Sequence, residues 1–228
     1  MENNNYQNEL KNTIHDLKIP ITSIMGFVEL LKKGTYNQKS QNEFLDIIYS
    51  ESQRLLDLVE ELLISSDKCK YSQGINKCNV NIQINKYVKA LSPLASKKNV
   101  EVIFNVDSND IYVSIPESKI SRIITNILEN AIKYNKEQGK VYINVVQKND
   151  KVNIKIKDTG MGIAENELDK IFAKNYRSAS AKNLSIPGSG LGLSIAKNFA
   201  EEYGGSIDVK SKIGEGTEFT VCFPEYNL

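Results

Sequence analysis

A heptad repeat of apolar residues near the start of the chain constrains the fold most strongly. The repeated positions alternate at spacings of four and three residues: Leu10, Ile14, Leu17, Ile21, Ile24, Val28 and Leu31. This spacing predicts a helix over residues 10–31 that packs in a helical bundle or coiled coil. His15, the single histidine of the 228 residues, stands beside the apolar seam. Its imidazole is therefore expected to face solvent, with Asp16 next to it.

A second amphipathic segment follows after a short loop. Lys32-Lys33-Gly34 is typical of a helix end, and Ser40-Gln41-Asn42-Glu43 has the form of a capping box that opens the next helix. Apolar residues continue at bundle spacing over residues 44–63. Because one hairpin of two such helices cannot bury both of its apolar faces, residues 1–66 are expected to form a dimeric four-helix bundle with a second copy of the chain.

Composition narrows the classes of partner. The formal net charge is +1 and no basic run is dense, so we expect no nucleic-acid binding. Cys69, Cys78 and Cys222 lack the spacing of a metal site, which predicts reduced thiols in a reducing compartment. The sequence has no apolar run of about 18 residues and no signal peptide, so we expect contact with a membrane only through a segment upstream of it.

The pattern changes after residue 66. Residues 67–79 lose the helical period and predict a linker, and residues 80–228 predict an α+β domain. Helices are expected at 81–97, 116–135 and 191–203, and strands at 100–106, 111–115, 141–147, 152–158, 207–210 and 217–223. Residues 163–188 have no period and end in a glycine cluster, which predicts a mobile loop.

Polar residues on one predicted helix of this domain suit a nucleotide. Asn126, Asn130 and Lys133 are spaced by four and three residues, which puts them on one helix face. Asparagine oxygens can bind Mg²⁺ without adding charge, and a lysine can meet a phosphate. A solvated polar helix face would show the same pattern, so this segment alone does not decide the function.

Two glycine-containing segments also have the chemistry of nucleotide binding. Asp158-Thr159-Gly160-Met161-Gly162 directly follows a predicted strand, and its carboxylate can accept a hydrogen bond from the adenine amino group, although an ordinary turn has the same form. Gly188-Ser189-Gly190-Leu191-Gly192 opens a helix, whose N-terminal N–H groups and dipole suit a phosphate. An irregular loop leads into this second segment, so it is not a dinucleotide fingerprint.

In this order the segments resemble the catalytic core of the sensor histidine kinases over almost the whole chain. His15-Asp16-Leu17-Lys18-Ile19-Pro20 looks like the histidine box, and Asn126-Ile127-Leu128-Glu129-Asn130-Ala131-Ile132-Lys133-Tyr134 looks like the asparagine box. The remaining nucleotide-binding boxes resemble Asp158–Gly162, Phe172 with Tyr176-Arg177, Gly188–Gly192 and Gly214–Thr217. Several motifs in the family's order make a chance match improbable.

The resemblance implies a domain plan and an activity. It implies a dimerisation and histidine-phosphotransfer domain at 1–66, a linker at 67–79 and a Bergerat-fold ATP-binding domain at 80–228, an α/β sandwich with a mobile lid at about 163–190. The expected activity is an autokinase that uses ATP and Mg²⁺ to phosphorylate His15 and passes the phosphoryl group to an aspartate in the receiver domain of a response regulator. The chain would be the cytoplasmic part of a membrane-bound sensor kinase.

The resemblance also assigns roles to single residues. Asp16 would orient or deprotonate His15, and Asp158 would bind the adenine amino group. Asn130, assisted by Asn126, would hold Mg²⁺. Lys133 and Arg177 would contact phosphate. The residues expected to bind the nucleotide are Asn126, Asn130, Lys133, Tyr134, Asp158, Gly160, Gly162, Phe172, Tyr176, Arg177, Gly188, Gly190, Leu191, Gly192 and Thr217.

Two positions depart from the family pattern. Four residues after the histidine the family often has Thr or Asn, which orients a water that dephosphorylates the regulator. This chain has Ile19, which can form no hydrogen bond, so weak phosphatase activity is expected. Asn175 stands where the family usually has an aromatic residue, which puts the packing of the lid in question. Ile19 and Phe27 lie off the heptad seam and suit either a docking surface for the regulator or a wider bundle core.

Two other functions fit parts of the sequence. Bergerat-fold ATPases of the gyrase, mismatch-repair and chaperone type, and serine kinases of the anti-sigma kind, resemble one another in a Glu four residues before the metal-binding Asn. This chain has Asn126 there, which lacks the basicity to activate water or a hydroxyl. The other alternative is a dimeric scaffold that binds nucleotide without turnover, which the presence of every expected polar group disfavours.

Overall fold

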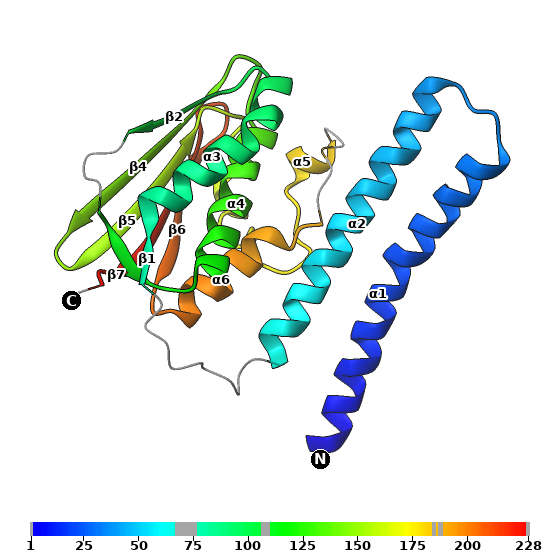
Figure 1. Ribbon diagram of the computed structural model, residues 1–228, viewed down its shortest axis with the longest axis horizontal. Coiled ribbons are helices and arrows are strands. Elements are labelled where there is room, and N and C mark those ends of the chain that lie inside the picture. Colours follow the sequence, from blue (N-terminus) through cyan, green and yellow to red (C-terminus); the bar gives the residue numbers. More distant parts are fainter. Residues whose placement is uncertain (1, 67–76, 106–109, 184–185, 187–188, 227–228) are drawn as a thin grey trace. The chain divides into compact units, whose positions relative to one another are not determined.

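The computed structural model describes residues 2–66, 77–105, 110–183, 186 and 189–226. For residues 2–16, 53, 54, 57, 60–66, 182 and 183 the structure describes the backbone only. The described residues form two compact units, one built on the first two helices and one holding the remaining helices and strands (Figure 1).

The first unit is an antiparallel helical hairpin of α1 (Glu2–Lys33) and α2 (Gln38–Ser66) (Figure 1). The helix α1 ends at Lys33, as the charge and glycine pattern predicts. The beginning of α2 differs from the expectation. The Oδ1 of Asn37 accepts a hydrogen bond from the Ser40 N–H at 2.9 Å, so the helix begins before the predicted capping box. Asn37 caps the helix because its oxygen meets an N–H that has no partner within the first turn.

Apolar contacts close the hairpin at its loop end, where Phe27 and Phe44 lie 5.4 Å apart between ring centroids. Phe27 therefore widens the hairpin core, the second of the two roles expected for it. A further set of large apolar side chains on the two helices remains 38–68% exposed: Ile19, Ile21, Met25, Leu30, Leu45, Tyr49, Leu56 and Val59. A single hairpin leaves this surface in water, which is costly for a face of this size.

The second unit is built on a five-stranded sheet in the order β2-β4-β5-β7-β6. Its strands are β2 (Glu101–Asn105), β4 (Lys140–Lys148), β5 (Lys151–Asp158), β6 (Ser206–Lys212) and β7 (Gly216–Pro224). The edge strand β2 pairs with β4 in parallel and the other neighbours are antiparallel. Asn149 and Asp150 join β4 to β5 with positive φ values of 55° and 56°, as in a tight hairpin turn.

Three helices cover one face of this sheet: α3 (Val80–Lys97), α4 (Glu117–Lys133) and α6 (Gly192–Glu202) (Figure 1). On α4 the fully buried residues Ile120, Ile123, Ile124 and Ile127 recur at helical spacing and supply the middle of the core. Along β5 every second residue is buried, namely Val152, Ile154, Ile156 and Asp158. The unit is thus a two-layer α/β sandwich, and the predicted α+β class is confirmed.

Three short elements lie where the sequence shows no regular pattern. The strand β1 (Lys77–Asn79) falls in the predicted linker and pairs with β3 (Tyr112–Ser114), which is distant in sequence. The predicted irregular segment contains a 3₁₀ turn at Glu165–Glu167 and the helix α5 (Ala179–Asn183). Elements of three to five residues are too short for a period to be visible, so contacts rather than local pattern decide them.

Two of the three cysteines lie within the described residues. Cys78 and Cys222 are free thiols, and Cys69 lies outside the described residues. Burial, with a smaller contribution from Glu117, raises the pKa of the Cys78 thiol to about 11, so this group is an unreactive part of the core. Within the described residues, every helix is too short or too polar to cross a bilayer.

Candidate nucleotide-binding site

Asp158 is the last residue of the central strand β5 and its side chain is buried. Its Oδ1 accepts hydrogen bonds from the N–H groups of Gly160 at 2.8 Å and Thr217 at 3.2 Å. Burial raises the pKa of this carboxyl to about 6, although the two hydrogen bonds act in the opposite direction. At neutral pH Asp158 is thus a desolvated carboxylate, and its Oδ2 has no partner among the described residues.

The loop after Asp158 is held tightly between α4 and the β6–β7 hairpin. The Met161 N–H donates to the Tyr134 carbonyl at 3.1 Å, and the Gly214 N–H donates to the Met161 carbonyl at 2.8 Å. Gly162 has a φ of +70°, and a Cβ on it would overlap the Lys212 carbonyl. Only glycine can adopt this positive φ readily and also leave room for the Lys212 carbonyl.

Thr217 closes this site through hydroxyl contacts as well as its N–H. Its Oγ1 lies 2.9 Å from the Ser211 Oγ, which also accepts the Ile163 N–H at 2.8 Å. Ser211 therefore joins the loop after β5 to the hairpin that supplies Thr217. No motif in the sequence indicates a role for Ser211, because a serine within a strand carries no distinctive local signal.

The three polar residues of α4 that the sequence singles out differ in their side-chain partners. The Asn126 Nδ2 donates to the Gly192 carbonyl at 2.9 Å, which ties α4 to the beginning of α6. Lys133 forms an ion pair with Glu129 at 2.8 Å, with both side chains about one third exposed. Asn130 lies between them, is half-buried, and forms no side-chain hydrogen bond to the residues that the structure describes. The spacing correctly predicts a shared helix, whereas the partners of Asn126 and Lys133 are set by tertiary contacts.

This arrangement fits a magnesium ion held jointly with a nucleotide. Amide oxygens are suitable ligands for Mg²⁺, and the Asn130 amide is half-buried without a partner among the described residues. Asn126 uses its Nδ2 in the contact with Gly192, so its Oδ1 stays available as a ligand. Over the described residues there is no cluster of three or more His, Cys, Asp or Glu.

Phe172 and Arg177 lie in the segment between β5 and α6. Phe172 contacts the sheet, and Arg177 contacts carbonyls of its own segment. Phe172 packs edge-on against Phe219 with 6.4 Å between ring centroids, and the Lys197 Nζ lies 5.0 Å from the Phe172 centroid. The Arg177 guanidinium donates to the carbonyls of Ala181 and Ile186. In this conformation Arg177 therefore bridges carbonyls of its own segment.

Tyr176 is anchored by Glu167, a residue that no motif in the sequence indicates. Its hydroxyl donates to the Glu167 Oε1 at 2.8 Å, and this oxygen also accepts the Ala179 N–H at 3.0 Å. The hydrogen bond to Glu167 raises the pKa of the Tyr176 phenol. The unexpected Asn175 has a φ of +59°, a left-handed conformation that asparagine tolerates better than an aromatic residue does.

The glycine-rich segment before α6 places a helix N-terminus at this site. Gly190 has a φ of +76°, and a Cβ on it would lie 2.7 Å from the Tyr176 carbonyl. Leu191 is buried next to the helix, and Gly192 is its first residue. The expected Gly188 lies outside the described residues.

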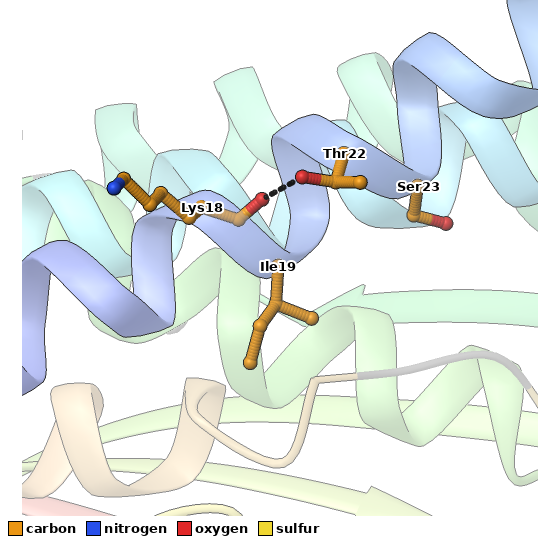
Figure 2. A pocket seen from close by; sticks show the side chains of 4 residues that line it. All are labelled: Lys18, Ile19, Thr22 and Ser23. Atoms are coloured by element: carbon orange, nitrogen blue, oxygen red, sulfur yellow. Dashed lines mark hydrogen bonds between the residues drawn. The ribbon is translucent and has the colours of Figure 1, made fainter.

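His15 and Asp16 lie on α1, and their side chains are outside the described residues. Ile19, one helical turn later, is 44% exposed. Figure 2 shows Ile19 with Lys18, Thr22 and Ser23, which line an open pocket, and the Thr22 hydroxyl donates to the Lys18 carbonyl at 2.9 Å. Thr22 thereby satisfies its hydroxyl on the helix backbone, and Ile19 presents only carbon atoms.

Two family models match the chain, one over the helical hairpin and one over most of the α/β unit. Residues 7–68 match the His Kinase A (phospho-acceptor) domain, and residues 116–227 match the histidine kinase-, DNA gyrase B- and HSP90-like ATPase family. The chain belongs to the sensor histidine kinases. The phospho-acceptor match separates it from ATPases of the gyrase and chaperone type, because it covers the helical hairpin that carries His15.

Individual histidine kinases agree with this assignment. The sensor histidine kinase WalK of Bacillus subtilis (strain 168) is 33% identical over 220 residues, which are 93% of this chain and 36% of WalK. The chain thus spans about a third of the length of that curated relative. The histidine kinase AdeS of Acinetobacter baumannii has a TM-score of 0.70 at 20% identity over 93% of this chain and 98% of its own.

The histidine kinase ThkA, solved in complex with the response regulator protein TrrA, has a TM-score of 0.67 at 24% identity over 96% of this chain and 61% of its own. The two solved structures show the histidine kinase fold. The family models and the similarity to WalK confirm the predicted family, and the family models confirm a helical hairpin followed by an ATPase domain.

Proposed function

We propose that this chain is an ATP-dependent protein histidine autokinase that phosphorylates His15 and then passes the phosphoryl group to an aspartate of a response regulator. The observation that carries the proposal is the buried Asp158 carboxylate. Its Oδ1 is held by two N–H groups and its Oδ2 is left to accept a hydrogen bond. It stands in a chain whose helical hairpin matches a phospho-acceptor domain.

Adenine recognition follows from the ionised state of Asp158 at neutral pH. An ionised carboxylate only accepts hydrogen bonds, and the adenine 6-amino group donates one. Guanine has a carbonyl oxygen at that position, so it would leave the desolvated carboxylate facing another acceptor. The site therefore suits ATP better than GTP.

The phosphates would extend towards α4 and α6. The α6 N-terminus offers N–H groups and a positive dipole end, and Lys133 supplies a cation after leaving Glu129. Asn130 and Asn126 would hold Mg²⁺, which neutralises charge on the phosphates during transfer. Arg177 would exchange its two carbonyl partners for phosphate oxygens when nucleotide is bound.

Transfer needs no base on α4, because imidazole is itself a nucleophile. A ring nitrogen of neutral His15 attacks the γ-phosphorus in line, the bond between this phosphorus and the β–γ bridging oxygen breaks, and ADP leaves. The proton on the other ring nitrogen passes to Asp16. Asn126 cannot activate water, which disfavours ATP hydrolysis as the main reaction.

The exposed apolar residues of α1 and α2 support a homodimer through residues 1–66. A second hairpin packed on this surface would complete a four-helix bundle. We further propose that the chain is the cytoplasmic part of a membrane-bound sensor kinase. Its match to about a third of WalK supports this, because a sensor kinase needs further segments.

The test is incubation with γ-labelled ATP and Mg²⁺, comparing the chain with His15→Ala. Because the chain has no other histidine, label on histidine can only be on His15. We expect label that survives alkali, is lost in acid and is absent from the variant. ATP binding without any label would instead favour a nucleotide-binding scaffold.

A further inference from the structure

The amide of Asn135 joins the elements that surround Asp158. This residue lies two positions after the last residue of α4 and is only 6% exposed. Its Oδ1 accepts hydrogen bonds from the Lys136 N–H at 3.0 Å and from the Thr159 hydroxyl at 3.2 Å. Its Nδ2 donates to the Lys140 carbonyl at 3.1 Å. A single buried amide thus connects the end of α4, the beginning of β4 and the end of β5.

Thr159 fixes the residue next to Asp158 from the other side. Its hydroxyl accepts the Lys140 N–H at 2.9 Å while it donates to Asn135. Its own N–H donates to the Lys140 carbonyl at 3.1 Å. The hydroxyl is therefore used as donor and as acceptor, which a residue of the same shape without oxygen cannot reproduce.

The backbone around this pair is closely packed at two glycines. A Cβ on Gly139 would overlap the Asn135 Oδ1, and a Cβ on Gly160 would overlap the Tyr134 carbonyl. Gly160 is also one of the two donors to the Asp158 carboxylate. The position of the carboxylate is thus coupled through Thr159 to a hydrogen-bond network that does not itself touch it.

We infer that Asn135 and Thr159 are positioning residues that set the selectivity of the site for adenine. They hold the end of β5 so that the free Oδ2 of Asp158 meets the 6-amino group at hydrogen-bond distance. Loss of the hydrogen bond between Asn135 and Thr159 would weaken the contact between Asp158 and the 6-amino group more than it weakens the contacts to phosphate and ribose. This inference rests on the proposed adenine-binding role of Asp158.

The experiment compares dissociation constants for ATP and for purine riboside triphosphate, which lacks only the 6-amino group, at one Mg²⁺ concentration. The variants are Asn135→Ala, Thr159→Val, Thr159→Ser and the double variant Asn135→Ala with Thr159→Val. Gln147→Ala is the matched control, because it removes an exposed side-chain hydrogen bond to Glu225 at the far end of β4. Thr159→Val keeps the side-chain shape, so it carries the test even if Asn135→Ala does not fold.

The unmodified chain is expected to prefer ATP on the order of tenfold, the worth of a hydrogen bond to a charged group. Asn135→Ala and Thr159→Val should each reduce this ratio at least about threefold, and the double variant should lose less than the two effects combined, because the residues act on one contact. Thr159→Ser and Gln147→Ala should keep the ratio.

The outcomes separate the inference from the function on which it rests. Variants that weaken both nucleotides equally would show a general structural role and overturn the inference, as would an unchanged ratio in Thr159→Val. An unmodified chain that binds ATP without preferring it, or binds neither nucleotide, would overturn the proposed role of Asp158 and the inference with it.

Discussion

At the scale of single residues, Asp158 combines a functional requirement with an energetic cost. Burial raises the pKa of its carboxyl to about 6 from an ordinary value of 3.8. A raised carboxyl pKa means that the unfolded chain releases its proton first, so stability falls as pH rises from about 4 to about 6 and stays reduced above that. The cost at neutral pH is about 3 kcal/mol, since each pKa unit corresponds to about 1.4 kcal/mol.

Asp158→Asn should therefore stabilise the folded domain and abolish ATP binding together. The asparagine Oδ1 can still accept the two N–H groups, whereas its Nδ2 would present hydrogens to the adenine amino group. In urea denaturation at pH 7 we expect a gain of about 1–3 kcal/mol that disappears near pH 4. A variant less stable than the parent at pH 7 would contradict this, because it would mean that the ionised carboxylate stabilises the fold.

Ile19 gives a second prediction at this scale. Its exposed side chain has no atom that can orient a water, so phosphatase activity towards a phosphorylated response regulator should be weak. Ile19→Thr should raise ADP-stimulated dephosphorylation at least about tenfold, because a positioned hydroxyl can place the attacking water. The measurement is the loss of phosphate from the labelled regulator.

A matched control is available on the same helix. The Glu29 side chain is exposed and lies outside the heptad seam and the exposed apolar surface of the two helices. Glu29→Thr should therefore leave dephosphorylation unchanged. Fast dephosphorylation by the unmodified chain would contradict the interpretation of Ile19.

At the scale of elements, α2 carries two apolar faces. Phe44, Ile48, Leu55 and Leu58 are half-buried. Leu45, Tyr49, Leu56 and Val59 form a second stripe at heptad-compatible spacing and remain exposed. A stripe of this kind is stable in water only when another helix covers it.

Leu56→Glu should therefore convert the proposed dimer to a monomer. A charge in the middle of the second stripe would have to be buried without a partner in the bundle. Sedimentation should show half the mass, whereas Lys39→Glu, an exposed change at the beginning of the same helix, should leave the dimer intact. A Leu56→Glu chain that stays dimeric would place the interface elsewhere.

At the scale of the whole molecule, periodicity predicts what long elements do and misses what distant contacts decide. The hairpin helices and the strands on either side of Asn149-Asp150 follow their sequence patterns closely, because their apolar periods span many residues. The strand β1 and the Asn37 cap were not predicted. One depends on pairing with β3, and the other on an asparagine that competes with the capping box after it.

In the candidate site, too, local motifs can be predicted from the sequence and contacts between distant residues cannot. Motif spacing predicts that Asp158, the α4 asparagines and the glycine-rich segment belong together, because each has a recognisable local form. It does not predict that Arg177 bridges carbonyls of its own segment, or that Asn135 and Thr159 share a hydrogen bond across 24 positions. The hydrogen-bond partners of a buried amide depend on which groups the fold brings next to it, and the spacing of residues in the sequence does not reveal those groups.

The hydrogen bond from the Thr217 N–H to Asp158 has a consequence for the chain during its synthesis. It joins residues 59 positions apart, and the donor lies on β7. A nascent chain that has already made α4 and β5 still lacks one of the two donors that hold the carboxylate. Folding of the nucleotide site on the ribosome would thus be postponed until the hairpin containing Thr217 has left the exit tunnel.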